Sequence, residues 1–184
     1  IVDDKLQTAE IFNFETKSAY TIRVQTDDGF GGTYDEIFII TIVNENDDPD
    51  DIILSSSVVS ENLPVNTIVG TLSSTDPDGD LIFTYALVSG TGADDNASFL
   101  VVGDELQTAE IFDFEVKSSY SVRIQTNDAT TGSYEEVFSI TVDDENEAPI
   151  DISISSVEIS ENQPVNTTVG TLSSIDPDGD LAFS

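Results

Sequence analysis

The sequence predicts an all-β protein, built from seven-stranded Greek-key β-sandwiches in tandem. Three observations lead to this class. The chain repeats itself at an offset of 100 residues. Its apolar residues alternate with polar ones over short runs rich in Val, Ile, Phe and Tyr, and turns rich in Gly, Pro, Asp and Asn separate these runs. No window has the 3.6-residue period of an amphipathic helix.

The repeat divides the chain into one complete unit and two halves. Leu6–Phe12 recurs as Leu106–Phe112, and Asp76–Asp80 recurs as Asp176–Asp180. The offset makes residues 1–49 the C-terminal half of a repeat, 50–149 a complete repeat and 150–184 the N-terminal half of the next. A half sandwich cannot bury its sheet faces alone. We therefore expect each half to need a partner, either in a longer chain or at the opposite end of a second copy.

The strands of the complete repeat follow from local pattern. The first is rich in Ile, Val and Ser, the second follows a turn containing Pro64, and the third follows the Asp76–Asp80 turn. The sixth alternates Tyr120, Val122 and Ile124 with polar residues. In order, the expected strands are Ile52–Val59, Thr67–Leu72, Leu81–Val88, Ser98–Val102, Leu106–Ile111, Ser119–Thr126 and Val137–Val142. About seven strands in about 100 residues favour the immunoglobulin-like sandwich architecture.

Composition excludes several classes of function. The 184 residues include 37 Asp and Glu but only 5 Lys and Arg, for a formal net charge of −32. Nucleic acids and anionic membrane surfaces need basic residues for binding, so neither is an expected partner. The absence of His and Cys removes a Ser-His-Asp triad, a thiol nucleophile and the usual zinc ligands. No apolar run reaches the about 18 residues of a membrane-spanning helix.

Acidic residues gather in turns at the ends of the expected strands. The turn Asp76–Asp80 matches positions 1, 3 and 5 of an EF-hand loop, but Leu81 stands where Gly is required and Leu87 where a bidentate Glu is required. The EF-hand interpretation therefore fails. Two linkers, Asn44–Asp50 and Asp144–Ile150, carry Asp, Asn and Glu without a basic residue. Such side chains suit a hard cation that takes six to eight oxygens at about 2.3–2.6 Å, whereas the alternative interpretation is a solvated acidic turn.

The order of these motifs resembles a known family. In order along a repeat, the motifs are Glu-Asn-x-Pro after the first strand, an Asp-x-Asp turn, an Asp-x-Glu or Asn-x-Glu, and an acidic linker with a proline at its end. Together they cover essentially the whole chain. The chain resembles tandem cadherin repeats, of the bacterial cadherin-like kind found in large surface proteins.

The resemblance implies Ca²⁺ at each joint between repeats, held by oxygens of two successive repeats. Asn13 and Asn44 stand where the family has Asp, and Asn keeps an oxygen ligand but loses a charge, so we expect weaker binding at the first joint. At the second joint, Glu147 stands where the linker of the family has Asp. For the second joint the implied ligands are Glu61, Asp113, Glu115, Asp144, Glu145 through its main-chain carbonyl, Asn146, Glu147, Asp176, Asp178 and Asp180. For the first joint they are Asn13, Glu15, Asn44, Glu45, Asn46, Asp47, Asp76, Asp78, Asp80 and Asp128.

The function that the resemblance implies is structural and adhesive. The leading hypothesis is a calcium-rigidified extracellular segment of a cell-surface adhesin, stalk or filament. Its expected partners are neighbouring repeats of the same chain and other copies of it. The alternative is a cadherin-like module that binds surface polysaccharide. A glycosidase with paired carboxylates is disfavoured, because acidic groups that recur every 100 residues suit a scaffold better than a single active site. We expect no enzymatic activity.

Overall fold

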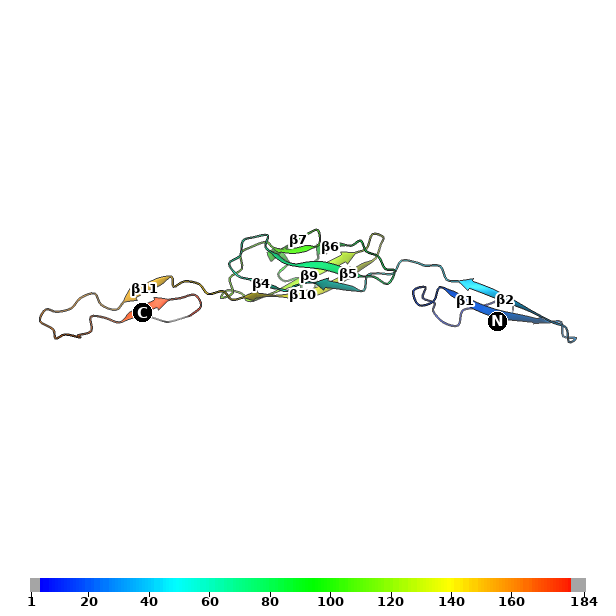
Figure 1. Cartoon of the computed structure of the whole chain (residues 1–184), viewed down its shortest axis with the longest axis horizontal. Coiled ribbons are helices and arrows are strands. Elements are labelled where there is room, and N and C mark those ends of the chain that lie inside the picture. The colour runs from blue at the N-terminus through cyan, green and yellow to red at the C-terminus, as the bar shows by residue number, and fades with distance from the viewer. Residues whose placement is uncertain (1–3, 180–184) are drawn as a thin grey trace. The chain divides into compact units, whose positions relative to one another are not determined.

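Strands and loops make up the protein. The structure is a computed structural model that describes residues 4–179, shown in Figure 1. Its regular elements are twelve strands and one 3₁₀ helix, η1 (Asn96–Ser98). The predicted all-β class is confirmed. In the part of the chain described here, no helix has the length and apolarity needed to cross a bilayer.

The described chain separates into two compact units. The first unit comprises residues 4–53, 73–84 and 126–135, and the second comprises 54–72, 85–125 and 136–179. The N-terminal acidic linker therefore shares a unit with the Asp76–Asp80 turn and Asp128. The C-terminal linker shares the other unit with Glu61, the Asp113–Glu115 segment and Asp178.

Two four-stranded sheets form the central sandwich. The polar Ser55–Ser57 segment separates β3 (Asp51–Leu54) from β4 (Val58–Ser60), so the single expected strand Ile52–Val59 is two strands in different sheets. One sheet has the order β4 (Val58–Ser60), β10 (Ser133–Asp143), β9 (Ser119–Asn127) and β6 (Thr84–Leu87). The other has the order β3 (Asp51–Leu54), β5 (Ile68–Thr75), β8 (Glu105–Thr108) and β7 (Phe99–Val102).

The expected strand Leu81–Val88 is shorter than predicted. Only Thr84–Leu87 joins a sheet, at the edge, as β6. Leu81 and Ile82 are 92% and 71% exposed, since the chain has not yet reached the sheet when it leaves the acidic turn. The apolar run there is consequently not a core strand along its whole length.

Alternation along β9 and β10 builds the core. Tyr120, Val122 and Ile124 of β9 are buried, as is Ile140 of β10. The ring of Tyr120 stacks on Phe112 at a centroid distance of 4.4 Å. Such aromatic pairs add about 0.5–1.5 kcal/mol beyond burial of their area. This core packs together the strands whose ends carry the acidic residues.

Each terminal half-repeat contributes a two-stranded sheet. β1 (Ala19–Asp27) and β2 (Thr33–Thr41) pair antiparallel over nine residue pairs, from Ala19↔Thr41 to Asp27↔Thr33. β11 (Asp151–Ile154) and β12 (Leu172–Ile175) pair antiparallel over four. A two-stranded sheet leaves an apolar face uncovered.

Candidate metal centre

The acidic turn has the same local structure in both copies. In Asp-Pro-Asp-Gly, the N–H of Asp78 donates to Asp76 Oδ1 at 2.8 Å, and Gly79 N–H donates to the Asp76 carbonyl at 3.0 Å. Gly79 has φ of 78°, a conformation that glycine adopts without steric cost. Asp176 accepts the corresponding bonds at 3.1 Å from Asp178 and 3.1 Å from Gly179. The turn therefore orients the side chain of its first Asp, Asp76 in one copy and Asp176 in the other.

A linker N–H holds the second Asp of each turn. Asp47 N–H donates to Asp78 Oδ2 at 2.6 Å, and Glu147 N–H donates to Asp178 Oδ2 at 2.7 Å. Asn44 Nδ2 adds a bond of 2.9 Å to Asp78 Oδ1. These bonds bring linker and turn together at both joints.

Glu61 ties the second linker to a further segment. It is only 1% exposed, and its two oxygens accept separate backbone N–H bonds, from Glu145 at 2.8 Å and from Phe114 at 2.8 Å. Phe114 lies between Asp113 and Glu115. A buried carboxylate with two N–H donors is held in one position, and it brings those two acidic side chains to the linker.

Carboxylates converge in four clusters, each with ligand atoms within 4.8 Å of one another. Two belong to the first joint and two to the second, and Glu115 takes part in both clusters of the second joint. The clusters are Glu15, Asp47 and Asp78; Asp76, Asp80 and Asp128; Glu61, Asp113 and Glu115; and Glu115, Glu147 and Asp178. Every predicted ligand in these sets is thus brought beside at least two others.

The donor set fits a hard cation. Three buried side-chain oxygens in these clusters, Asp76 Oδ2, Glu147 Oε2 and Asp178 Oδ1, have no hydrogen-bond partner. A buried polar atom without a partner is costly, and charged groups cost more than neutral ones. The ion pairs Arg23–Asp35 and Lys117–Asp95 lie outside the clusters. Oxygen-only clusters of this kind match the preference of Ca²⁺.

Crowding shifts the protonation of these groups. Burial, together with the nearby Asp80 and Asp78 carboxylates, raises the pKa of Asp76. Burial and the charges on Glu61, Asp144 and Asp178 raise the pKa of Glu115. The two joints therefore resist being fully charged when no cation is present.

The pKa of Glu147 and the pKa of Asp78 shift in opposite directions, because a different contribution dominates at each carboxylate. The hydrogen bond from Asn62 favours the charged form of Glu147, but burial and neighbouring carboxylates outweigh it and raise the pKa. By contrast, the Asp47 N–H and the Asn44 amide lower the pKa of Asp78. Asp78 therefore ionises more readily than a free Asp, whereas Glu147 ionises less readily than a free Glu.

The remaining predicted ligands lie around the clusters. Asn46 Nδ2 donates to Asp128 Oδ2 at 2.9 Å, and Asn13 Oδ1 accepts from Thr16 N–H at 2.7 Å within its own turn. Asn146 Nδ2 donates to the Glu147 carbonyl at 2.9 Å. The side chains of Glu45, Asp144, Glu145 and Asp176 are outside the four clusters, and Asp180 lies outside the described residues.

The sequence did not identify the residues whose side chains donate hydrogen bonds to the carboxylates of the site. Asn62 Nδ2 donates to Glu147 Oε1, and Asn62 has φ of 59°. Ser60 Oγ donates to Glu145 Oε1 at 2.9 Å. At the first joint, Thr130 Oγ1 lies within hydrogen-bond distance of Asn46 Oδ1 and Asp128 Oδ1, and its one proton can be donated to either. The recurrence of Ser-Glu-Asn in both copies was the available signal for Ser60 and Asn62.

Comparison with known proteins supports a cadherin-like chain. No family model matches it. Protocadherin Fat 4 from Mus musculus is 29% identical over 177 residues, and the Homo sapiens protein is 29% identical over 180 residues. These matches cover 90% and 91% of this chain. The chain spans only 4% of the length of either relative.

Solved structures give the same fold. Extracellular cadherin domains 1–4 of protocadherin gamma B7 match with a TM-score of 0.64 and 26% identity, over 91% of this chain and 43% of that one. Mouse protocadherin-24 EC1–3 matches with a TM-score of 0.55 and 18% identity, over 92% of this chain and 59% of that one. The cadherin-like β-sandwich fold predicted from the sequence is thereby confirmed.

Proposed function

We propose that this chain is a calcium-rigidified extracellular segment of a cell-surface adhesin, stalk or filament, with Ca²⁺ at the joints between repeats 1–49, 50–149 and 150–184. The observation that carries the proposal is the gathering of carboxylates from separate chain segments around buried oxygens that have no hydrogen-bond partner. Solvated acidic turns would instead expose such oxygens to water.

The proposed ligands are those of the four clusters, completed by oxygens of the linkers. Bound Ca²⁺ would supply the positive charge that these carboxylates lack, and would take six to eight of their oxygens. At the second joint we assign Glu61, Asp113, Glu115, Asp144, Glu145, Asn146, Glu147, Asp176, Asp178 and Asp180. At the first joint we assign Asn13, Glu15, Asn44, Glu45, Asn46, Asp47, Asp76, Asp78, Asp80 and Asp128.

Backbone N–H groups of the protein orient carboxylates at both joints. The N–H groups of Asp47 and Glu147 orient Asp78 and Asp178 across each joint. Glu61 fixes the second linker against the Phe114 segment. Without a cation the carboxylates repel one another across these short bonds, so the joint loosens. With a cation they attract a shared charge, so the joint stiffens.

The magnitude of this effect suits an extracellular setting. Extracellular calcium modules bind with Kd of about 10⁻⁴–10⁻³ M. At a free calcium concentration ten times Kd, each ion would stabilise the folded form by about 1.4 kcal/mol. The similar structures are extracellular cadherin domains, and one of them is a protocadherin gamma B7 cis-dimer. We therefore include neighbouring repeats and other copies of the chain as partners, an extracellular location and a non-enzymatic role.

The experiment is small-angle scattering combined with a thermal melt, in millimolar calcium, after chelation, and in magnesium. The proposal expects chelation to shorten the particle and to lower the melting temperature, with magnesium restoring neither. If chelation changes neither quantity, the acidic joints are solvated turns. Polysaccharide binding would then be the function to test.

A further inference from the structure

An early strand of the complete repeat runs beside its last strand. β4 lies at the edge of its sheet and pairs in parallel with β10, with Val58 opposite Thr141 and Ser60 opposite Asp143. Both strands are labelled in the central sandwich of Figure 1. Because the two strands are parallel, the chain enters this pair at one end and leaves it at the other. Tension along the chain therefore pulls β4 and β10 in opposite directions along their own axes.

A pull in this direction loads the contacts between β4 and β10 together. Thr141 N–H donates to the Ser57 carbonyl at 2.9 Å, and Glu61 N–H donates to the Asp143 carbonyl at 3.1 Å. These bonds lie on either side of three paired residues, and Val59 between them is only 5% exposed. Strands that slide past each other must break all of these contacts at once. Strands that separate from one end break them one pair at a time.

Side chains extend the pairing beyond the end of β4 into the second linker. Glu61 Oε1 accepts the backbone N–H of Glu145 at 2.8 Å. Ser60 Oγ donates to Glu145 Oε1 at 2.9 Å, and Asn62 Nδ2 donates to Glu147 Oε1. A pull on the linker therefore reaches β4 through these bonds as well as through β10.

The chain that follows β4 is also tied to the core of the repeat. Glu61 Oε2 accepts the backbone N–H of Phe114 at 2.8 Å. Asn62 N–H donates to the Phe112 carbonyl at 2.9 Å. Phe112 is 2% exposed, so the segment that receives these bonds is itself packed in the core. The end of β4 is consequently held from two sides.

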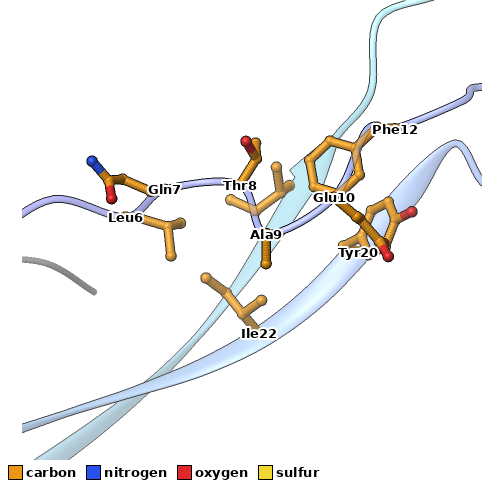
Figure 2. Close-up of a pocket in the computed structure, with 9 residues that line it drawn as sticks. Leu6, Gln7, Thr8, Ala9, Glu10, Phe12, Tyr20 and Ile22 are labelled. Carbon is orange, nitrogen blue, oxygen red and sulfur yellow. The ribbon is translucent and has the colours of Figure 1, made fainter.

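The aromatic contact that fixes this segment recurs along the chain. The ring of Phe112 stacks on Tyr120 with centroids 4.4 Å apart. One hundred residues earlier, Phe12 and Tyr20 have centroids 4.6 Å apart, and Figure 2 shows the two rings side by side. The same support for the segment after β4 is thus encoded in both copies.

We propose that residues 57–62 and 141–147 form a mechanical clamp that sets the resistance of the complete repeat to tension along the chain. A stalk carries such tension, so this inference adds to the proposed function. The clamp consists of hydrogen bonds and buried side chains of the chain itself, and it acts without a bound cation. Forced unfolding is governed by the unfolding rate, which rises when contacts broken in the transition state are weakened.

The first test compares two pulling directions by single-molecule force spectroscopy in a chelator. The chain has no Cys, so introduced cysteines define the points of attachment. Ser57→Cys with Ala148→Cys pulls along the clamp, whereas Ser57→Cys with Ser139→Cys pulls β4 and β10 apart from their shared end. All three positions are exposed. At the same force, the pull along the clamp should unfold the repeat more slowly, by about tenfold or more.

The second test uses two matched substitutions. Val59→Ala and Val69→Ala remove the same atoms from side chains that are both 5% exposed. Val59 belongs to the clamp, whereas Val69 lies in β5 of the other sheet. Denaturant titration measures what each change costs at equilibrium. Under a pull along the clamp, Val59→Ala should unfold about tenfold faster than the parent chain, and Val69→Ala less than about twofold faster.

Either of two results would overturn the proposal. One is an unfolding rate that is the same in both pulling directions. The other is a Val69→Ala substitution that accelerates forced unfolding as much as Val59→Ala does. Failure of the proposed calcium joints is distinguishable from both, because it would appear as a thermal melt that chelation leaves unchanged.

Discussion

The backbone N–H of Glu147 donates a hydrogen bond of 2.7 Å to Oδ2 of Asp178, and this bond joins the second linker to the acidic turn that follows it. The first joint repeats the bond between Asp47 and Asp78 at 2.6 Å. The same carboxylates belong to clusters of three acidic residues. At both joints, a carboxylate that accepts a linker N–H bond therefore lies beside other carboxylates. This arrangement costs free energy unless a cation is present.

Glu115→Gln should change stability in opposite directions with and without calcium. Burial and the like charges on Glu61, Asp144 and Asp178 raise the pKa of Glu115, so removing its charge should raise the melting temperature in a chelator. In calcium the same change removes a ligand and should weaken binding about tenfold, which corresponds to about 1.4 kcal/mol. Thermal melts in the two buffers measure both effects.

Glu110→Gln is the matched control for that prediction. Glu110 is exposed and belongs to none of the clusters of described residues. Its substitution should leave both melts nearly unchanged. A Glu115→Gln variant that melts lower than wild type in the chelator would contradict the repulsion on which the prediction depends.

Glu61→Gln should destabilise the metal-free protein as well. Both carboxylate oxygens accept backbone N–H bonds, and the amide group of Gln would place a donor against one of these N–H groups. The expected loss in free energy of unfolding is about 1–3 kcal/mol, the cost of leaving a buried group unsatisfied. Glu161→Gln changes the exposed counterpart and should stay within about 0.5 kcal/mol of wild type. Denaturant titration in a chelator distinguishes the two, and equal losses would contradict the role assigned to Glu61.

Gly70→Ala should destabilise the central repeat through a backbone clash. A Cβ at Gly70 would lie 2.6 Å from the Ser56 carbonyl oxygen and 2.9 Å from the Ser56 nitrogen. Overpacking of this kind costs about 1–3 kcal/mol. Near-ultraviolet circular dichroism of the tyrosines follows unfolding, since the chain has five Tyr and no Trp.

The repeat supplies a control for this substitution too. Gly170 has the same close approach, 2.7 Å to the Ser156 carbonyl oxygen, in a segment outside the central sandwich. Gly170→Ala should leave the main unfolding transition in place. A Gly70→Ala variant as stable as wild type would show that β5 moves away from Ser56 to make room for the added methyl group, and would contradict the predicted clash.

The half-buried Asp95 should contribute stability that depends on pH. Although its burial opposes ionisation, the Lys117 ammonium and the Ser121 N–H hold the pKa of Asp95 below its ordinary value of 3.8. A lowered folded-state pKa gives stability that is present above 3.8 and is lost as pH falls through the folded-state value. Asp95→Asn should therefore cost about 1.5 kcal/mol at pH 7, and less at lower pH.

Denaturant titrations of wild type and Asp95→Asn between about pH 2 and pH 7 measure this difference. Asp104→Asn is a suitable control, because Asp104 is exposed and should show no such change. A difference between wild type and Asp95→Asn that stays constant down to pH 2 would contradict the assignment.

Strong periodicity made most of the fold predictable from the sequence. The alternation around Tyr120, Val122 and Ile124 predicted a strand at Ser119–Thr126, and β9 ends one residue later, at Asn127. The apolar run at Leu81 was misleading, because periodicity cannot distinguish an edge strand from the exposed residues that precede it. Equally, a change of sheet at Ser55–Ser57 leaves no signature in a short run of strand-forming residues.

The acidic positions of the candidate site were predictable because they recur at a fixed spacing, but their contacts were not. The bonds from Asn62 to Glu147 and from Thr130 to Asn46 join residues more than 80 positions apart. Such pairs depend on how the folded segments meet, which local pattern does not specify. The ion pair between Asp95 and Lys117 could not be predicted from the sequence for the same reason.

Isothermal titration with calcium tests the central claim most directly, using wild type, Asp78→Asn and Asp178→Asn. We expect wild type to bind calcium with Kd of about 10⁻⁴–10⁻³ M and to show two classes of site, the weaker at the first joint. Asp78→Asn should remove the weaker class and Asp178→Asn the stronger one, with magnesium substituting at neither. Absence of calcium binding by wild type, or binding that neither substitution alters, would contradict the assignment of the two joints as calcium sites.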